Sequence, residues 1–449
     1  MKFRPSFLFV AVLAVRALWA APVDNLALPE RAMPGLGPIL EQAMQQSPRM
    51  LNRALDLEIA ENGRIESRSY LLPYVGGNYR QVESRDDRAD LSETIRVNKV
   101  YYDFSITQPV FYWGERRNNY RASQISKLIA QGNYREAYRS LAQELRGKFG
   151  SLIVQKNQLA RARRALAYAQ QQVKIAEERL AKKVISDLEI YPIRLSAEQG
   201  QISLERTEFE FETAKHSFAR LAGIPSITDE QIPDEVPIVG YDASAMNELL
   251  SGFLSAKELP NNEVVNLRRQ LEIQELQYKN AKTRLRPKVS AVMGTNQDEQ
   301  SFSINNAAKY RVTSNYVGVS VSWTIFDGFA SQASVRNAIA RRRQAENDLT
   351  EANDRVAQQA QAQARYVNFA ARTMAISDRA LVAAEANLRG KEADFKRGVA
   401  SESDVSLAEL ALYDQRFYTY SARLDYLSKT GEFLGTLNQD PLVAVLPVK

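Results

Sequence analysis

The chain has 449 residues, a quarter of them charged, and a formal net charge of +6. So small an excess of positive charge, with acidic and basic residues interleaved, argues against a nucleic-acid partner. Cysteine is absent, which excludes disulfides, thiolate metal sites, a cysteine nucleophile and a lipid-modified cysteine. The single histidine, His216, has no second ligand at a suitable spacing, and no phosphate-binding loop is present. We therefore expect no metal, no cofactor and no enzymatic activity.

The first 21 residues are typical of an export signal. Lys2 and Arg4 precede an apolar run at residues 7–15, and small residues follow it. This run is too short to stay in the membrane as an anchor, and the rest of the chain has no stretch of 18 apolar residues. The sequence therefore predicts an exported protein without a transmembrane helix.

The remainder of the chain consists of two similar halves. An offset of 215 residues places Phe326 on Phe111 and Asp404 on Glu189 without a gap. A unit of about 200 residues is far longer than the roughly 50-residue units of solenoids, so it indicates a duplicated half-molecule. The expected segments are a signal peptide (1–21), a first repeat (22–222), a proline-rich linker (223–243), a second repeat (244–437) and a tail (438–449).

Each half is expected to begin with a helix and two strands. The predicted helices cover residues 38–70 and 244–284, and the predicted strands cover residues 74–80, 100–112, 288–295 and 315–326. Apolar and polar residues alternate in the strands, so that Val317, Val319 and Val321 are separated by Gly318 and Ser320. A period of two gives each strand one apolar and one polar face.

Such strands usually form a half-buried sheet on the core of a soluble protein. Two features favour a lipid-facing sheet instead: the chain is exported, and only four strands accompany a very large helical part. Aromatic residues near the predicted strand ends fit a membrane-interface girdle: Tyr101, Tyr102, Tyr112, Trp113 and Trp323. An open sheet cannot lie in lipid, because its edge N–H and C=O groups would be unsatisfied. The strands must therefore close a barrel with those of other copies.

A long helical hairpin is expected after each pair of strands. Residues 115–180 and 330–394 contain no proline and are rich in good helix formers. About 65 residues at 1.5 Å each give a rod of roughly 100 Å. The predicted tips lie at residues 182–187 and 397–403, and returning helices run to about residues 220 and 434.

Two short motifs, each present in both halves, accompany this arrangement. At the passage from strand to helix the second half reads Thr324-Ile325-Phe326-Asp327-Gly328, and the first half has Phe111 and Gly114 at similar positions. At the tip of the hairpin, an aromatic or apolar residue is followed by a turn residue, a serine and an acid. The second half has Phe395, Gly398, Ser401 and Asp404, and the first half has Leu180, Lys183, Ser186 and Glu189.

In the order and spacing of these elements, residues 35–437 resemble the TolC-like outer membrane efflux protein family. The resemblance implies a mainly α-helical chain with a small β part. Three chains with four strands each would form a twelve-stranded β-barrel in the outer membrane, continued by an α-helical barrel in the periplasm. The implied function is the exit channel of a tripartite efflux or type I secretion system. The implied partners are outer-membrane lipid, two further copies of the chain, a periplasmic adaptor (membrane fusion protein) and an inner-membrane transporter.

The resemblance also assigns roles to the repeated residues. Phe111, Gly114, Phe326 and Gly328 would form the turns from strand to helix. Lys183, Ser186, Gly398 and Ser401 would form the tips that meet the adaptor. Asp404, Glu189, Phe395 and Leu180 are candidates for the periplasmic gate, where rings of carboxylates would favour cations.

A simpler role for the two tip acids is helix capping, since Ser186 and Glu189 have the spacing of a capping box. This chain also departs from members of the family that lock the entrance with polar groups, because it has Phe395, Ala400 and Leu407 where those members have a tyrosine, an arginine and an aspartate. Polar cross-chain links are therefore not expected to hold its entrance shut.

Two other functions remain open at this point. A periplasmic adaptor also has a long helical hairpin, but usually only one, placed between two β segments. A structural coiled-coil protein of the envelope would show strict heptads, which residues 340–390 lack. The exported substrate, whether a drug, a metal ion or a polypeptide, cannot be deduced from the sequence.

Overall fold

The computed structural model describes residues 28–33, 35–87, 95–301 and 309–444. The expected signal peptide and the end of the predicted tail lie outside these residues. Contacts between residues divide the chain into two compact units, and each unit takes segments from both repeats. Unit 2 consists of residues 56–131 and 266–351, and unit 1 contains the remaining described residues.

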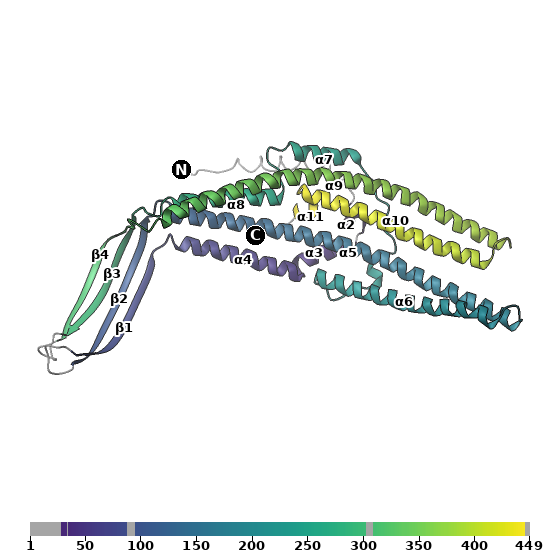
Figure 1. Cartoon of the computed structure of the whole chain (residues 1–449), viewed down its shortest axis with the longest axis horizontal. Coiled ribbons are helices and arrows are strands. Elements are labelled where there is room, and N and C mark those ends of the chain that lie inside the picture. The colour runs from purple at the N-terminus through teal and green to yellow at the C-terminus, as the bar shows by residue number, and fades with distance from the viewer. Residues whose placement is uncertain (1–27, 34, 88–94, 302–308, 445–449) are drawn as a thin grey trace, which may run out of the picture. The chain divides into compact units, whose positions relative to one another are not determined.

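Unit 2 contains an antiparallel sheet of four strands in the order β1-β2-β3-β4 (Figure 1). The strands are β1 (Tyr74–Asp86), β2 (Ile95–Phe111), β3 (Lys288–Ser301) and β4 (Lys309–Ser322). The four predicted strands are confirmed, but they extend further from the helices than predicted. Much of the predicted charged loop at residues 81–99 is strand, because backbone pairing continues beyond the point where the apolar alternation ends. At its other end β4 stops at Ser322 instead of residue 326.

The register of the strands gives the sheet one apolar and one polar face. Val75 lies opposite Ile106, Ile106 opposite Met293, and Met293 opposite Val317. Because residues opposite each other share a face, these side chains form one apolar row across the sheet. The neighbouring row, which points to the other face, consists of Gly76, Ser105, Gly294 and Tyr316. The alternation predicted from the sequence is therefore confirmed.

A bulge near the helical end of β2 accommodates a proline within an inner strand. Pro109 lies opposite Ser290, and the register then shifts so that Phe111 lies opposite Val289. Proline cannot donate a ladder hydrogen bond, and in inner strands it is found at such irregularities. The shift returns Phe111 to the apolar face.

Two long helical hairpins follow the strands, as predicted (Figure 1). They are α5 (Glu115–Ala181) with α6 (Asp187–Ala222), and α9 (Ala330–Lys396) with α10 (Glu402–Thr436). Each long helix has 67 residues, so it spans roughly 100 Å. The tips are the five-residue turns 182–186 and 397–401.

The helix that precedes each pair of strands is broken into two, which the sequence analysis did not predict. In the first half these are α3 (Leu36–Gln46) and α4 (Pro48–Ser69), and in the second α7 (Ala243–Ser255) and α8 (Asn262–Ala281). Ser47 is extended, with ψ of 130°, because a residue before proline disfavours the helical conformation. Pro48 then begins the next helix. The shorter elements are α2 (Pro29–Ala32), a 3-10 turn (Asp229–Gln231) and α11 (Pro441–Ala444).

The main hydrophobic core lies in unit 1. Phe149 of α5 and Phe218 of α6 are fully buried, with ring centroids 5.8 Å apart. The linker contributes Ile232 and Val236, so it packs onto the helices through apolar side chains. The helices lie in the order α6, α5, α10, α9, as ion pairs between neighbours show: Arg163–Glu208 at 3.1 Å, Arg161–Asp414 at 2.5 Å and Arg423–Asp378 at 2.8 Å.

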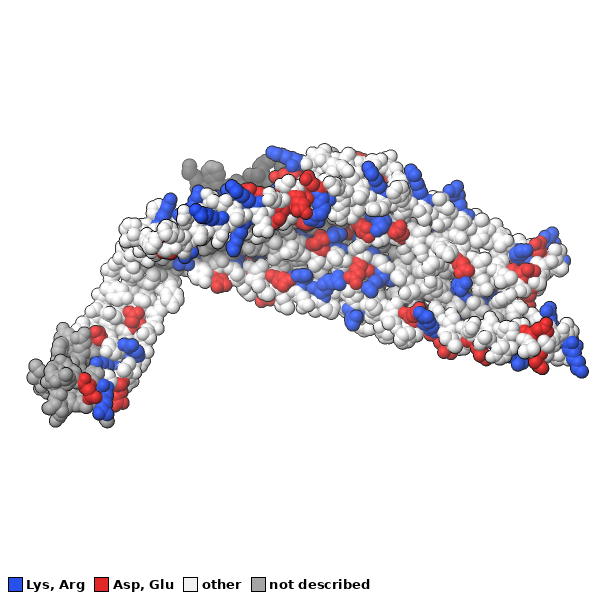
Figure 2. All heavy atoms as spheres, viewed as in Figure 1, with Lys and Arg blue, Asp and Glu red and all other residues white. Residues whose placement is uncertain are grey.

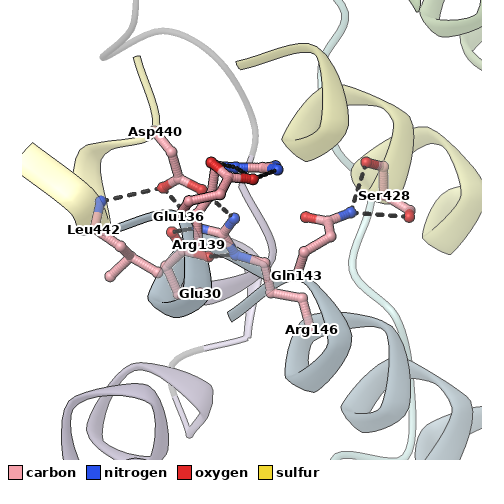
Figure 3. Close-up of polar contacts among 8 residues, drawn as sticks. All are labelled: Glu30, Glu136, Arg139, Gln143, Arg146, Ser428, Asp440 and Leu442. Carbon is pink, nitrogen blue, oxygen red and sulfur yellow. Dashed lines mark hydrogen bonds and ion pairs between the residues drawn. The ribbon is translucent and has the colours of Figure 1, made fainter. Parts of the chain in front are cut away.

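A buried arginine joins both ends of the described chain to this core (Figure 3). The guanidinium of Arg146 lies 2.6 Å from Glu30 of α2 and 2.7 Å from Asp440, which precedes α11. The Arg146 side chain is 1% exposed, and the Asp440 carboxylate also accepts the backbone N–H of Leu442. Removing one partner from such a buried pair leaves an uncompensated charge, so the cluster fixes both terminal segments.

Candidate functional site

The apolar face of the sheet is exposed to solvent in the single chain. Val317, Val319 and Val321 of β4 are 83%, 69% and 61% exposed, and Val75, Tyr79 and Met293 are also at least half exposed. Monomeric soluble proteins rarely expose contiguous apolar surfaces of this kind, which mark contact with a membrane or a partner. The sheet is therefore not half of a soluble core.

The dimensions of this face fit a bilayer. The apolar face of β2 runs from Val100 to Phe111, which is roughly 36 Å at about 3.3 Å per residue. A strand tilted by about 40° covers about 28 Å of bilayer thickness with that length, close to the ~25 Å apolar band of membrane barrels. Within the described residues, β1 and β4 each pair on one side only. Their free edges need strands from other copies before the sheet can enter lipid.

Aromatic side chains lie where the sheet meets the helices. Tyr112 and Trp113 follow β2 and Trp323 follows β4, as predicted for a girdle. The indole N–H of Trp113 donates to the carbonyl of Pro287 at 2.8 Å, and that of Trp323 donates to Leu285 at 2.9 Å. Tyr101 and Tyr102, by contrast, lie in the middle of β2, because this strand begins earlier than predicted.

The turns from strand to helix contain the residues that the motif indicated. Trp113 and Gly114 have φ angles of 54° and 85°, and Gly328 and Phe329 have φ angles of 62° and 67°. Two consecutive residues in this left-handed region reverse the chain sharply. In the second half Asp327 accepts the backbone N–H of Ser331 at 2.9 Å, which satisfies the start of α9.

The two hairpin tips close in the same way. Lys183 has φ of 59° and Gly398 has φ of 77°, and the two residues are 215 positions apart. In each tip the next N–H donates back to the last turn of the long helix, from Val184 to Arg179 and from Val399 to Asp394, both at 2.9 Å. This is the hydrogen-bond pattern of a Schellman motif, which ends a helix through one left-handed residue.

Both tip acids cap the returning helices. Glu189 accepts the backbone N–H of Ser186 at 2.7 Å and its hydroxyl at 2.9 Å, and Asp404 accepts the same groups of Ser401 at 2.8 and 2.7 Å. The backbone bond from Ser186, with the hydroxyl bond second, lowers the pKa of Glu189. The hydroxyl and then the backbone N–H of Ser401 lower the pKa of Asp404. Both carboxylates are exposed and charged, so capping and an electrostatic role at the entrance are compatible.

The apolar gate candidates differ in exposure. Phe395 is 46% exposed, whereas Leu180 is partly buried. Other apolar side chains at the tips are more exposed, above all Leu188 at 86% and Val399 at 78%. These residues were not among the predicted gate residues, although they can be recognised in the sequence as apolar residues inside predicted turns or at the start of the returning helix.

A row of polar contacts ties the first hairpin to the second near the tips. From α5, Arg161 pairs with Asp414 at 2.5 Å, Arg164 pairs with Glu409, and the hydroxyl of Tyr168 lies 3.1 Å from that of Ser403. Arg164 also donates to Ser406. These residues were not predicted as functional, because their only local signal is a spacing of three to four residues on one face of a helix.

Two further findings concern other kinds of site. The described ranges contain no cluster of three acidic or histidine side chains suited to a metal ion. No helix in the same ranges combines the length and the apolar character needed to span a bilayer.

Comparison with known proteins agrees with the architecture. Residues 39–223 match the sequence model of the family described as outer membrane efflux protein, whereas no curated protein matches the whole sequence significantly. The outer membrane protein VceC of Vibrio cholerae is 16% identical, with a TM-score of 0.65 over 91% of this chain and 97% of VceC. The outer membrane channel CmeC of Campylobacter jejuni is 12% identical, with a TM-score of 0.70 over 91% and 88%. The open state of the MtrE outer membrane channel of Neisseria gonorrhoeae is 16% identical, with a TM-score of 0.57 over 90% and 89%.

At such low identities the solved structures establish the fold, and the match to the outer membrane efflux protein family covers residues 39–223. Both repeats take part in the structural match, since it covers about nine tenths of the chain. The family consists of non-enzymatic channels of the outer membrane, with a helical part in the periplasm. The sequence match over residues 39–223 and the shared fold make the chain similar to the outer membrane efflux proteins that its two repeats resemble.

Proposed function

We propose that this chain forms a homotrimeric exit duct for a tripartite efflux or type I secretion system. Three sheets would close into a twelve-stranded barrel in the outer membrane, and the hairpins would form a helical barrel in the periplasm. Transport through such a duct is passive. Selection of the substrate and the energy for transport come from an inner-membrane transporter.

The observation that carries this proposal is the exposed apolar face of the sheet together with its two free edges. On the polar face, the row next to the apolar one consists of glycine, serine and tyrosine residues, which suits a water-filled lumen. A lipid-facing exterior, a polar interior and edges that need other copies are the three requirements of an oligomeric membrane barrel.

We assign adaptor contact to the hairpin tips. Val184, Leu188 and Val399 are 69%, 86% and 78% exposed, and they lie at or beside the two turns. Exposed apolar side chains at the end of a helical hairpin fit the tip of another helical hairpin, whereas they would be unfavourable facing water alone. A periplasmic adaptor joined to a transporter would present such a tip.

We assign control of the entrance to the tip acids and to the contacts between the hairpins. Glu189 and Asp404 would place six carboxylates around the mouth of a trimer. The contacts of Arg161, Arg164 and Tyr168 with α10 hold the first hairpin against the second within each chain. Opening would move one hairpin relative to the other, so these contacts would need to rearrange. This intrachain row takes the place of the polar cross-chain locks that the sequence lacks.

The channel function is tested by reconstitution. Purified, signal-free protein is expected to have the mass of a trimer in detergent and to conduct ions when it is inserted into planar bilayers. Cell fractionation is expected to find the chain in the outer membrane. A protein that stays monomeric in water without detergent and conducts no ions would contradict the proposal.

The gate is tested separately by conductance of Asp404→Ala and Glu189→Ala channels. Loss of these carboxylates is expected to reduce the preference of the channel for cations, because carboxylates at a narrow mouth attract cations. It is also expected to increase the ion current through the closed channel. The matched control is Asp354→Ala on α9, away from the tips. Unchanged cation preference and leak in both tip variants would leave capping as the only role of these acids.

A further inference from the structure

The turn between α8 and β3 concentrates positive charge at the end of the sheet that adjoins the helices. Residues 279–288 contain five cations and no acid, and no acid occurs from residue 276 to residue 297. The corresponding turn of the first repeat, residues 65–74, has one arginine and one glutamate. The concentration of charge therefore belongs to the second repeat alone. The cations are Lys279, Lys282, Arg284, Arg286 and Lys288.

Most of this charge is not neutralised within the chain. Lys288 pairs with Glu115 at 2.7 Å, and Arg284 lies 3.5 Å from Asp327. In the part of the chain that the structure describes, Lys279, Lys282 and Arg286 form no ion pair, and all three are exposed. The turn therefore presents several cations that can bind an anion from outside the chain.

Aromatic contacts place these cations next to the apolar face of the sheet. The guanidinium of Arg286 lies 4.6 Å from the ring centroid of Trp113, and Trp113 makes an edge contact with Phe111 at 4.7 Å. Phe111 lies opposite Val289 on the apolar face. The order from the sheet outward is thus aliphatic side chain, aromatic ring, guanidinium, which matches the order of hydrocarbon, interface and headgroup in a bilayer.

The carbonyls of the same turn hold the two tryptophans. Trp113 donates to Pro287, and Trp323, which is 60% exposed, donates to Leu285. In the face drawn in Figure 2, Lys and Arg side chains lie on the helices next to the sheet, while the adjoining half of the sheet is almost free of charged atoms. Charge and apolar surface thus meet at one boundary.

We propose that this α8–β3 turn, together with Trp113 and Trp323, binds the headgroups of anionic phospholipids in the leaflet that faces the periplasm. The inference rests on the proposed insertion of the sheet in the outer membrane. The chemistry favours lipid over a free anion, because the cations are spread along an exposed turn continuous with the apolar face. Basic residues at a bilayer surface attract anionic lipids, and a trimer would repeat the surface three times.

The two tryptophans also provide the test. Trp19 lies in the expected signal peptide, so the mature chain contains only Trp113 and Trp323. Full-length mature protein is reconstituted in phosphatidylcholine vesicles that contain an equal mole fraction of either brominated phosphatidylglycerol or brominated phosphatidylcholine. Bromine quenches tryptophan on contact. We expect the anionic lipid to quench at least about twofold more than the zwitterionic lipid, since several cations attract it.

The variant Lys282→Gln with Arg284→Gln and Arg286→Gln should remove this preference while both lipids still quench. The matched control replaces three exposed cations of α9 near the tip, Arg379, Arg389 and Lys396, with glutamine and should keep the preference. Equal quenching by the two lipids in the unmodified protein, or a preference that survives the α8–β3 variant, would overturn the proposal. An absence of quenching by either lipid would instead refute membrane insertion, and with it the proposed function.

A final experiment distinguishes binding of a lipid headgroup from binding of a free anion. Inorganic phosphate added to the protein in neutral detergent should leave the tryptophan emission unchanged, whereas phosphatidylglycerol added to the same sample should shift it. An equal shift with phosphate at millimolar concentration would mean that the turn binds free phosphate, and the lipid assignment would be wrong.

Discussion

The two repeats have similar backbone geometry but differ in their side chains and in the environment of those side chains. α5 and α9 both have 67 residues, and the left-handed residues Lys183 and Gly398 occupy equivalent positions at their tips. The side chains differ: Arg146 of α5 is buried between two carboxylates, while its counterpart 215 residues later, Gln361 of α9, is exposed. A few turn and cap residues thus preserve the geometry of both halves. The remaining positions have diverged, so that the buried arginine cluster belongs to the first repeat and the basic turn at the sheet to the second.

The two repeats should be equivalent in the sheet. Introducing a charged side chain on its apolar face should reduce assembly more than any other change proposed here. Val319 and its counterpart Phe104 both lie on this face. Arginine at a lipid-facing position near the bilayer centre costs ~2–4 kcal/mol in each copy. Val319→Arg and Phe104→Arg are each expected to prevent assembly, measured as the trimer recovered from outer-membrane fractions.

Ser320→Arg is the control for this prediction. Ser320 lies next to Val319 but on the polar face, opposite Ser290, so an arginine there would face the lumen. Normal assembly is expected, with at most a change in conductance. If Ser320→Arg blocked assembly as strongly as Val319→Arg, the assignment of the two faces would be wrong.

The core is where the repeats should differ most. Arg146→Ala leaves the carboxylates of Glu30 and Asp440 buried without a partner, which should destabilise the chain by about 3–5 kcal/mol. Gln361→Ala at the equivalent position of α9 should change stability by less than about 0.5 kcal/mol, as exposed substitutions usually do. Denaturant unfolding followed by helical circular dichroism measures both variants. Similar losses would mean that the buried ion pairs of Arg146 do not stabilise the chain more than an exposed glutamine does.

These contrasts also show what could be predicted from the sequence. Period-two alternation predicted both faces of the sheet, because a sheet between lipid and water must alternate. The outer parts of the strands were missed, since residues such as Gln81 and Glu83 have no apolar pattern and are held by backbone pairing. The break at Ser47 depends on one proline within an otherwise helical stretch.

The residues of the candidate site also fall into those that could be predicted from the sequence and those that could not. Tip residues were identified because turns and caps have short local signatures, and the lengths of the hairpins followed from helix propensity. The contact between Arg161 and Asp414 joins residues 253 positions apart, and a single sequence gives no indication of which helices will be neighbours. Long-range pairing of exposed charges therefore needed the structure.

The caps test whether the two tips are equally stable. Ser401→Ala and Ser186→Ala each remove an N-cap hydroxyl, which should cost ~1 kcal/mol and speed hydrogen exchange in the first turn of α10 or α6 by about fivefold. The pKa of Asp404 is below its ordinary value of 3.8 in the folded chain, so its contribution is present above that pH and is lost as the pH falls below it. The protection of the amides at the tip of the second hairpin, which is their exchange relative to the intrinsic rate at the same pH, should therefore begin to fall below about pH 4.

The smallest expected effect concerns the residue that adopts the left-handed conformation at each tip, which is lysine in one and glycine in the other. Lys183 has φ of 59°, a conformation that costs a residue with a side chain ~1 kcal/mol, whereas Gly398 adopts it without strain. Lys183→Gly should stabilise the first tip by about 0.5 kcal/mol, because the relief of strain is partly offset by the greater freedom of glycine in the unfolded chain. Gly398→Ala should destabilise the second tip by ~1 kcal/mol through strain alone, since nothing lies within 4 Å of the added methyl group. Hydrogen exchange of Val184 and Val399, whose N–H groups close the two turns, measures both changes in one experiment. Opposite signs at the two tips would show that the duplicated turn keeps one geometry whichever residue occupies it, while a loss at both would mean that Lys183 makes a stabilising contact of its own.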